Sequence, residues 1–168
     1  KSKFMCLDIK YTGKSTKDKI DLVRGEIEKA GADGFLLGSL DDIAWLFNIR
    51  GKDVRHNPVV IAYAFISNYE AILFVDKEKL DDEVYKELLD QGVECKGYDE
   101  AADFISKVDK DSIIVLDKDR ISRWLYSSIP EECDIISMPN LTTLPKGIKN
   151  SEEIENQRIA YLKDGAVL

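Results

Sequence analysis

One stretch of the sequence, residues 48–58, is dense in side chains that can bind a polar ligand. Arg50 carries a planar guanidinium, which can donate two parallel hydrogen bonds to a ligand carboxylate. Asp53 can orient Arg50 or Arg55 by pairing with it, and His56 can donate a hydrogen bond to a peptide backbone. Because binding residues are often carried by loops on a rigid scaffold, this loop is the first candidate site.

The candidate site comprises five polar residues of the loop, namely Asn48, Arg50, Asp53, His56 and Asn57. A rival interpretation is that Arg50 and Asp53 pair only with each other and stiffen the loop. Another is that the loop is a solvated turn, with its backbone shaped by Gly51 and Pro58. The residue types alone leave these alternatives open.

The two elements that flank the loop are expected to hold it at one edge of a sheet. Residues 40–47 predict a short helix, with Ser39 as its N-cap and Asp42 placed as in a capping box. Residues 59–66 predict a buried strand. Trp45 is expected to be a core or interface aromatic rather than a binding residue. The helix and the strand are expected to pack through four apolar residues, namely Ile43, Phe47, Val60 and Ala62.

Other catalytic chemistries find little support in the residue types. The chain has 1 His and 3 Cys without any C-x-x-C spacing, whereas a metal site usually draws on several such ligands at short spacing. No G-x-S-x-G motif of a serine nucleophile is present. Acidic pairs such as Asp41-Asp42 lie near expected helix starts, where they complement the helix dipole. We therefore expect neither a metal site nor a catalytic residue in this chain.

A nucleotide-binding interpretation arises at residues 13–16, Gly-Lys-Ser-Thr, which match the end of a phosphate-binding loop. The motif requires a second glycine five residues before Gly13, where the backbone must approach the phosphates closely. That position is Asp8, and its carboxylate would repel them. The phosphate-binding interpretation is therefore set aside.

The composition restricts the possible partners. The 168 residues include 24 basic and 32 acidic side chains, for a net charge of −8, so no basic surplus is available for the phosphates of a nucleic acid. The apolar runs are too short to cross a membrane, and no signal peptide is recognised. The odd number of cysteines favours a reducing compartment, so we expect a cytoplasmic protein. Asn140 begins a glycosylation sequon that we attribute to chance.

Helix and strand patterns alternate along the chain and predict an α/β fold. The pattern over 16–30 has apolar residues three and four apart and ends at Gly31, which is typical of an amphipathic helix. Strands are expected at 35–37, 59–66, 71–75, 93–96, 112–116 and 134–137, and further helices at 40–47, 79–89, 100–108 and 120–127. Because 59–66 and 71–75 predict a hairpin, the sheet is expected to be mixed, with five or six strands.

Both ends of the chain are expected to be junctions with other parts of a longer protein. The expected division is an interdomain junction at 1–15, the α/β domain at 16–138, and a linker with a following helix at 139–168. The last helix is expected to begin with Ser151 as its cap. Its apolar residues Leu162 and Val167 are expected to remain uncovered by this domain.

The region around the candidate loop resembles a known family. Residues 40–58 match the pattern L-D-[DE]-I-A-W-L-x-N-[IL]-R-G-x-D-x-x-x-N-P, found in the creatinase/prolidase-type amino-terminal domain of Xaa-Pro aminopeptidases. Residues 11–15 resemble the opening of the second domain in the three-domain enzymes. Residues 149–166 resemble the helix that leads into the catalytic domain. The resemblance therefore spans the whole chain.

The resemblance implies a fold, an activity and partners for the parent protein. The implied fold is a creatinase/prolidase N-terminal-like domain, with a mixed sheet covered by helices on both faces and a ribonuclease H-like motif. The implied activity is release of an amino-terminal residue that precedes proline. Two divalent metal ions, typically manganese, would be held by a separate catalytic domain of the same chain, through two Asp, one His and two Glu. The five loop residues would then line the substrate cleft, whose ligands are short proline-containing peptides, in a homodimer.

Two functional hypotheses remain. In the first, the chain is a non-catalytic accessory domain of an Xaa-Pro metallopeptidase. In the second, it is a freestanding binding or regulatory domain without peptidase activity. A metal-ligand set encoded beyond residue 168 would distinguish the first from the second.

Overall fold

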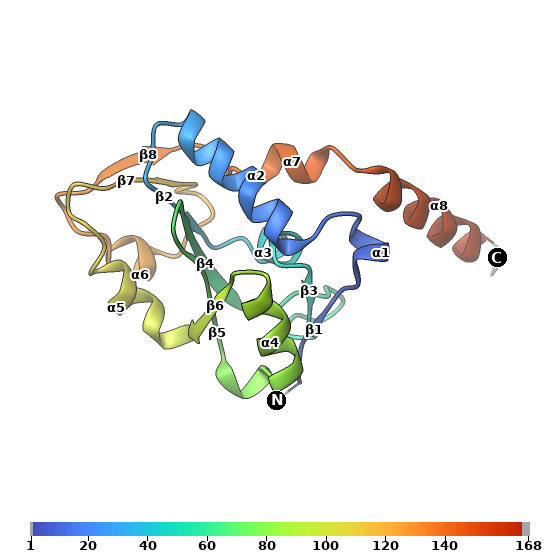
Figure 1. Ribbon diagram of the computed structural model, residues 1–168. Coiled ribbons are helices and arrows are strands. Elements are labelled where there is room, and N and C mark those ends of the chain that lie inside the picture. Colours follow the sequence, from blue (N-terminus) through green and yellow to red (C-terminus); the bar gives the residue numbers. More distant parts are fainter. Residues whose placement is uncertain (1, 166–168) are drawn as a thin grey trace.

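The computed structural model describes residues 2–165 and contains a six-stranded mixed sheet (Figure 1). The strands, in their spatial order, are β6 (Glu94–Gly97), β5 (Ala71–Val75), β4 (Ala62–Ser67), β2 (Gly34–Leu37), β7 (Ile113–Leu116) and β8 (Asp134–Ser137). The β4–β5 hairpin and the β2–β4 pair are antiparallel, and the other neighbours are parallel. The expected mixed α/β sheet and its hairpin are confirmed, although β4 begins at Ala62 rather than at residue 59.

Helices cover both faces of the sheet, as expected, because the central strands are apolar on both sides. Along β4, Ala62 and Ala64 belong to one core, whereas Tyr63 and Phe65 belong to the other. The helices α2 (Thr16–Lys29), α3 (Leu40–Leu46) and α4 (Asp82–Asp90) contribute buried residues to the first core, and α5 (Ala101–Ile105) and α6 (Arg123–Tyr126) contribute to the second. Strand alternation therefore divides the interior into two layers.

A second, two-stranded sheet lies beside the start of the candidate loop, and the sequence pattern did not predict it. The strand β1 (Met5–Cys6) pairs antiparallel with β3 (Ile49–Arg50), with Met5 opposite Arg50. Phe4 is buried in the first core, and the short helix α1 (Ile9–Thr12) follows. The 3₁₀ turn η1 (Lys77–Lys79) contacts this segment, since the Lys79 carbonyl accepts from the Phe4 N–H, whereas a second 3₁₀ turn, η2 (Tyr98–Glu100), lies against β5 and α5. The amino-terminal segment thus packs directly against the strand that carries Arg50.

Residues 139–149 differ from the irregular linker expected there, since they contain the short helix α7 (Thr143–Gly147) and pack against α3. The buried Asn140 donates hydrogen bonds to Ser39 Oγ (2.8 Å) and to Asp42 Oδ2 (3.0 Å). Ser39 is the N-cap residue of α3, as expected, but the expected capping box is absent, because the Ser39 hydroxyl makes no cap hydrogen bond and accepts instead from a side chain distant in sequence. Lys146 adds ion pairs to Asp42 and its neighbour Asp41.

The last helix, α8 (Ser151–Gly165), extends away from the sheet (Figure 1). Its cap is Asn150 rather than Ser151, because Asn150 and Glu153 exchange backbone-to-side-chain hydrogen bonds of 3.0 and 2.9 Å, as in a capping box. Asn150 also donates to the Thr12 carbonyl of α1. Leu162 is 74% exposed, so the domain leaves it uncovered as expected, and Val167 lies outside the described residues.

Candidate functional site

Arg50 is the last residue of β3, and its half-buried side chain lies against the carboxyl-terminal end of α3. Its Nη1 atom donates to the carbonyl oxygens of Ala44 and Ile49, both at 2.8 Å. The last carbonyls of a helix lack partners within the helix and favour a cation, so Ala44 is a natural acceptor for Arg50. Burial lowers the pKa of the Arg50 guanidinium. Within residues 2–165, no carboxylate forms an ion pair with Arg50.

Asp53 pairs with neither arginine, so both expectations for its partner are wrong. Its carboxylate forms an ion pair with Lys79 of η1 at 2.8 Å, and the Asp53 side chain is only 6% exposed. Its second oxygen accepts a hydrogen bond from the backbone N–H of Ile61 at 2.7 Å. Asp53 therefore anchors the middle of the loop to η1 and to the start of β4. The stiffening role has a physical basis, but it uses Lys79 rather than Arg50.

The other three candidate residues occupy two different environments. Asn48 is buried, and its backbone has a φ of 53°, in the left-handed region that asparagine tolerates. His56 has a φ of 62° and lies with Asn57 on the exposed tip of the loop, where a bridge joins Val54 and Asn57. In the described part of the chain, the side chains of His56 and Asn57 make no hydrogen bond or ion pair. The structure thus brings Asn48 and Arg50 to the end of α3 and leaves the loop tip in solvent.

Lys19 is part of this site, although its residue type and position did not mark it as a candidate. Its side chain is buried inside the domain, with 1% exposure. Its ammonium donates to the Trp45 carbonyl at 2.9 Å and to Asn48 Oδ1 at 2.7 Å, and it lies 4.5 Å from the centre of the Trp45 ring. Burial lowers the pKa of Lys19 to about 8. The available signal was its spacing, since Lys19 precedes Val23 by four residues on the buried face of α2.

Trp45 is buried within the first core, which confirms its expected structural place. The expected packing of α3 on β4 is also present, since Ile43, Phe47, Val60 and Ala62 are all buried. The loop between them therefore starts and ends on rigid, well-packed elements.

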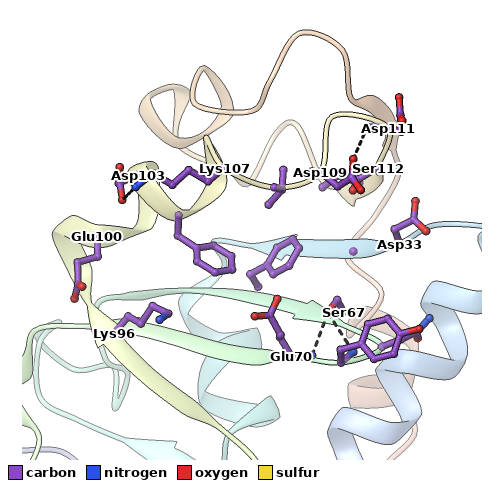
Figure 2. A pocket seen from close by; sticks show the side chains of 17 residues that line it. Asp33, Ser67, Glu70, Lys96, Glu100, Asp103, Lys107, Asp109, Asp111 and Ser112 are labelled. Atoms are coloured by element: carbon purple, nitrogen blue, oxygen red, sulfur yellow. Dashed lines mark hydrogen bonds and ion pairs between the residues drawn. The ribbon is translucent and has the colours of Figure 1, made fainter.

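A hollow of about 740 Å³ lies at the other end of the sheet (Figure 2). Ser67, at the end of β4, and Glu70, before β5, line it, whereas the candidate loop leads into the start of β4. Its floor includes Phe65 and Phe104, whose ring centres are 5.6 Å apart. None of the five candidate residues lines this hollow.

Four of the charged residues that line the hollow form ion pairs with one another or with neighbours, namely Lys96, Glu100, Asp103 and Lys107. Asp103 pairs with Lys107 at 2.7 Å, and Lys96 pairs with Glu94 at 2.6 Å. Glu100 pairs with Lys77 at 2.9 Å. The other four, Asp33, Glu70, Asp109 and Asp111, are exposed. Among its described lining residues, the hollow therefore has no buried charge without a counter-ion, unlike the site at the end of α3.

The described residues contain no group of three or more His, Cys, Asp or Glu side chains that could hold a metal ion. With 1 His in the chain, the residues present do not fit a dinuclear metal centre. None of the described helices is both long and apolar enough to cross a membrane. Gly13 ends α1 with a φ of 67°, and Ser15 caps α2, so residues 13–16 join two helices.

Comparison with protein families matches residues 1–153 to the Creatinase/Prolidase N-terminal domain. Among curated proteins, the chain is 38% identical to the probable Xaa-Pro aminopeptidase P of Coprinopsis cinerea, over 96% of this chain and 28% of that protein. It is 32% identical to Xaa-Pro aminopeptidase 1 of Dictyostelium discoideum, over 100% of this chain and 26% of that protein. The chain thus spans roughly a quarter of the length of these two relatives.

Solved structures give the same picture. The X-prolyl aminopeptidase of Caenorhabditis elegans, described as a cytosolic enzyme with a di-nuclear active site, superposes with a TM-score of 0.89 at 28% identity, over 98% of this chain and 28% of that chain. The Xaa-Pro dipeptidase of Bacillus anthracis superposes with a TM-score of 0.61 at 18% identity, over 84% of this chain and 38% of that chain. The second similarity concerns the fold alone.

Proposed function

The chain belongs to the creatinase/prolidase N-terminal domain family, and we propose that it is the non-catalytic accessory domain of an Xaa-Pro metallopeptidase. Relatives along nearly its whole length are named Xaa-Pro aminopeptidases, which supports this assignment. The parent enzyme would be a hydrolase that releases an amino-terminal residue preceding proline. Its two divalent metal ions, manganese in our proposal, would be bound by a catalytic domain outside residues 1–168, because the residues of this chain do not fit such a centre.

Arg50 carries the proposal for the role of this domain. The Arg50 guanidinium is half-buried, and no carboxylate within residues 2–165 neutralises its charge. Two carbonyls bind only its Nη1 atom, so the other nitrogens remain available as donors. A carboxylate brought to this rim would complete the pair through charge-assisted hydrogen bonds. We assign that carboxylate to the peptide substrate or to the catalytic domain, so that the loop shapes access to the cleft.

The remaining features of the proposal follow the family. The domain would occupy residues 16–138, with a junction before it and a linker with its helix after it. The parent enzyme would act as a homodimer on short proline-containing peptides in the cytosol, where the Caenorhabditis elegans relative is located.

The test compares Arg50→Ala with Arg55→Ala in the full-length protein. Arg55 is the matched control because it is exposed in the same loop. We expect Arg50→Ala to raise KM or to lower kcat/KM for Xaa-Pro peptides about tenfold or more, with little loss of thermal stability, and Arg55→Ala to leave both unchanged. Arg50→Lys keeps the charge without the fork geometry and should recover only part of the loss.

Peptides with free and amidated carboxyl termini identify the partner of Arg50. If the loss disappears with amidated peptides, Arg50 binds the substrate carboxylate. If it persists equally, the partner is a carboxylate of the catalytic domain. Unchanged kinetics with a lowered melting temperature would instead show that Arg50 only stabilises the loop.

The freestanding alternative is tested by translating the reading frame beyond residue 168. A set of two Asp, one His and two Glu within the next few hundred residues supports the accessory-domain proposal. Absence of that set would favour the freestanding binding domain.

A further inference from the structure

We propose that Lys19 is the positioning residue of Arg50, acting from inside the domain through Asn48 and the end of α3. The inference rests on the proposed role of Arg50 and names the group that holds it in place. Lys19 itself does not reach a ligand, because its side chain is 1% exposed.

The two cations bind consecutive carbonyl groups of the same helix end. Lys19 Nζ donates to the carbonyl of Trp45 at 2.9 Å, and Arg50 Nη1 donates to the carbonyl of Ala44 at 2.8 Å. Carbonyl groups in the last turn of a helix receive no hydrogen bond from an N–H group of the same helix, and they carry the negative end of its dipole. The position of Arg50 relative to α3 therefore depends on a helix end that Lys19 also holds.

Asn48 connects Lys19 to the backbone that carries Arg50. Its Oδ1 accepts from Lys19 at 2.7 Å, and its Nδ2 donates to the Lys14 carbonyl at 2.9 Å. The Asn48 backbone has a φ of 53°, in the left-handed region, at the point where the chain leaves α3 and enters β3. Because Arg50 follows two residues later, the conformation of Asn48 sets the direction in which β3 and its guanidinium leave the helix.

The charge of Lys19 distinguishes this contact from ordinary core packing. A buried ammonium costs stability unless other groups compensate for its lost hydration. Here the compensation comes from two oxygen acceptors and the face of the Trp45 ring at 4.5 Å, and no carboxylate forms an ion pair with Lys19 in the part of the chain that the structure describes. Glu153 of α8 favours the charged form, whereas Arg50 and Lys14 oppose it. An apolar residue would fill this space on α2, but it could not bind Trp45 and Asn48.

A double-mutant cycle in the full-length protein tests the inference. The variants are Lys19→Met, Arg50→Ala and the two combined, with Lys17→Met as the matched control, since Lys17 is exposed on the same helix. With Arg50 present, we expect Lys19→Met to raise KM for Xaa-Pro peptides on the order of tenfold. In the Arg50→Ala background it should have no further effect, because the two residues act as one unit. Lys17→Met should leave KM unchanged, both with Arg50 present and in the Arg50→Ala background.

The outcomes separate this inference from the proposed function. If Arg50→Ala leaves the kinetics unchanged, the proposed role of Arg50 is wrong, and the positioning role falls with it. If Arg50→Ala raises KM and Lys19→Met does not, only the positioning role is wrong. An equal loss from Lys19→Met in both backgrounds also overturns it, because Lys19 would then act independently of Arg50.

A second variant decides the question if Lys19→Met does not fold. Asn48→Gly removes one of the two oxygen acceptors of Lys19 and leaves the Trp45 carbonyl in place, and glycine adopts a φ of 53° without strain. We expect Asn48→Gly to raise KM severalfold with Arg50 present and to have no effect in the Arg50→Ala background. An unchanged KM in Asn48→Gly would contradict the inference.

Discussion

Where β4 begins, the cations Lys19 and Arg50 bind the carbonyls at the end of α3, and neither has a carboxylate partner within residues 2–165. Where β4 ends, the hollow of about 740 Å³ has many more charged side chains around it, but pairs such as Asp103 with Lys107 are exposed and balance each other. The size of a hollow and the number of charges around it therefore say little about binding. Charge that is buried and lacks a counter-ion is the more informative feature, because other groups must be held in place around it to compensate for its lost hydration.

The largest effect is expected for the domain on its own, since the residues that the structure describes contain no set of side chains that could hold a metal ion. The isolated 168-residue chain should fold, yet it should neither hydrolyse Xaa-Pro peptides nor retain a pair of metal ions. Circular dichroism, a peptide assay and metal analysis after dialysis check the three parts. About two manganese or zinc ions per chain after dialysis would contradict the prediction.

The ion pairs near the start and near the end of β4 should differ strongly in their contribution to stability. Asp53→Ala leaves Lys79 (15% exposed) without its partner and the Ile61 N–H without its acceptor, so the free energy of unfolding should fall by about 3 to 5 kcal/mol. Asp103→Ala breaks an exposed pair at the hollow and should cost within about 0.5 kcal/mol. Urea denaturation of both variants measures the difference. Equal losses of unfolding free energy in the two variants would contradict the prediction that the buried pair stabilises the fold more than the exposed pair.

The buried ammonium of Lys19 should make stability depend on alkaline pH. Its pKa is about 8 in the folded chain, against an ordinary value of 10.5, so the unfolded chain holds more protons between these two values. Stability therefore rises with pH in this range, by about 2 kcal/mol between pH 8 and pH 10. We expect this gain in the native chain and in Lys17→Met, and its absence in Lys19→Met, by urea denaturation across the range. The same pH dependence in all three chains would show that other groups cause it.

The smallest effect is expected from Glu70→Gln, because Glu70 lines the hollow beside Ser67 at the end of β4 (Figure 2). The change removes an exposed charge, so stability should change by less than about 0.5 kcal/mol. In the full-length protein kcat/KM should stay within twofold of the native value. A marked rise in KM would mean that the hollow takes part in binding.

Local sequence patterns were sufficient for most elements of the fold. The helix α2 follows from apolar residues three and four apart and from the stop at Gly31, and the β4–β5 hairpin follows from two apolar runs around a polar turn. These features depend on neighbours a few residues away. The strand β1 and the helix α7 were not predicted, because each is short and is held mainly by partners far along the chain.

The candidate loop was located by its residue types, but the partners within it were not. Lys19 meets Asn48 29 positions later in the chain, and Asn140 meets Asp42 across 98 positions. No periodicity encodes such contacts, and Asp53 had two nearby arginines but pairs with Lys79 instead.

The sequence by itself determined the mixed α/β class, the family resemblance and the loop in which polar side chains concentrate, because periodicity and motif spacing are local properties. Tertiary structure alone decided that Asp53 is an anchor, that Lys19 is buried beneath Trp45 and Asn48, and that Arg50 remains without a carboxylate partner in the described part of the chain. The physical reason is that the value of a charge depends on its burial and on its counter-ions, and both are set only when distant segments pack together.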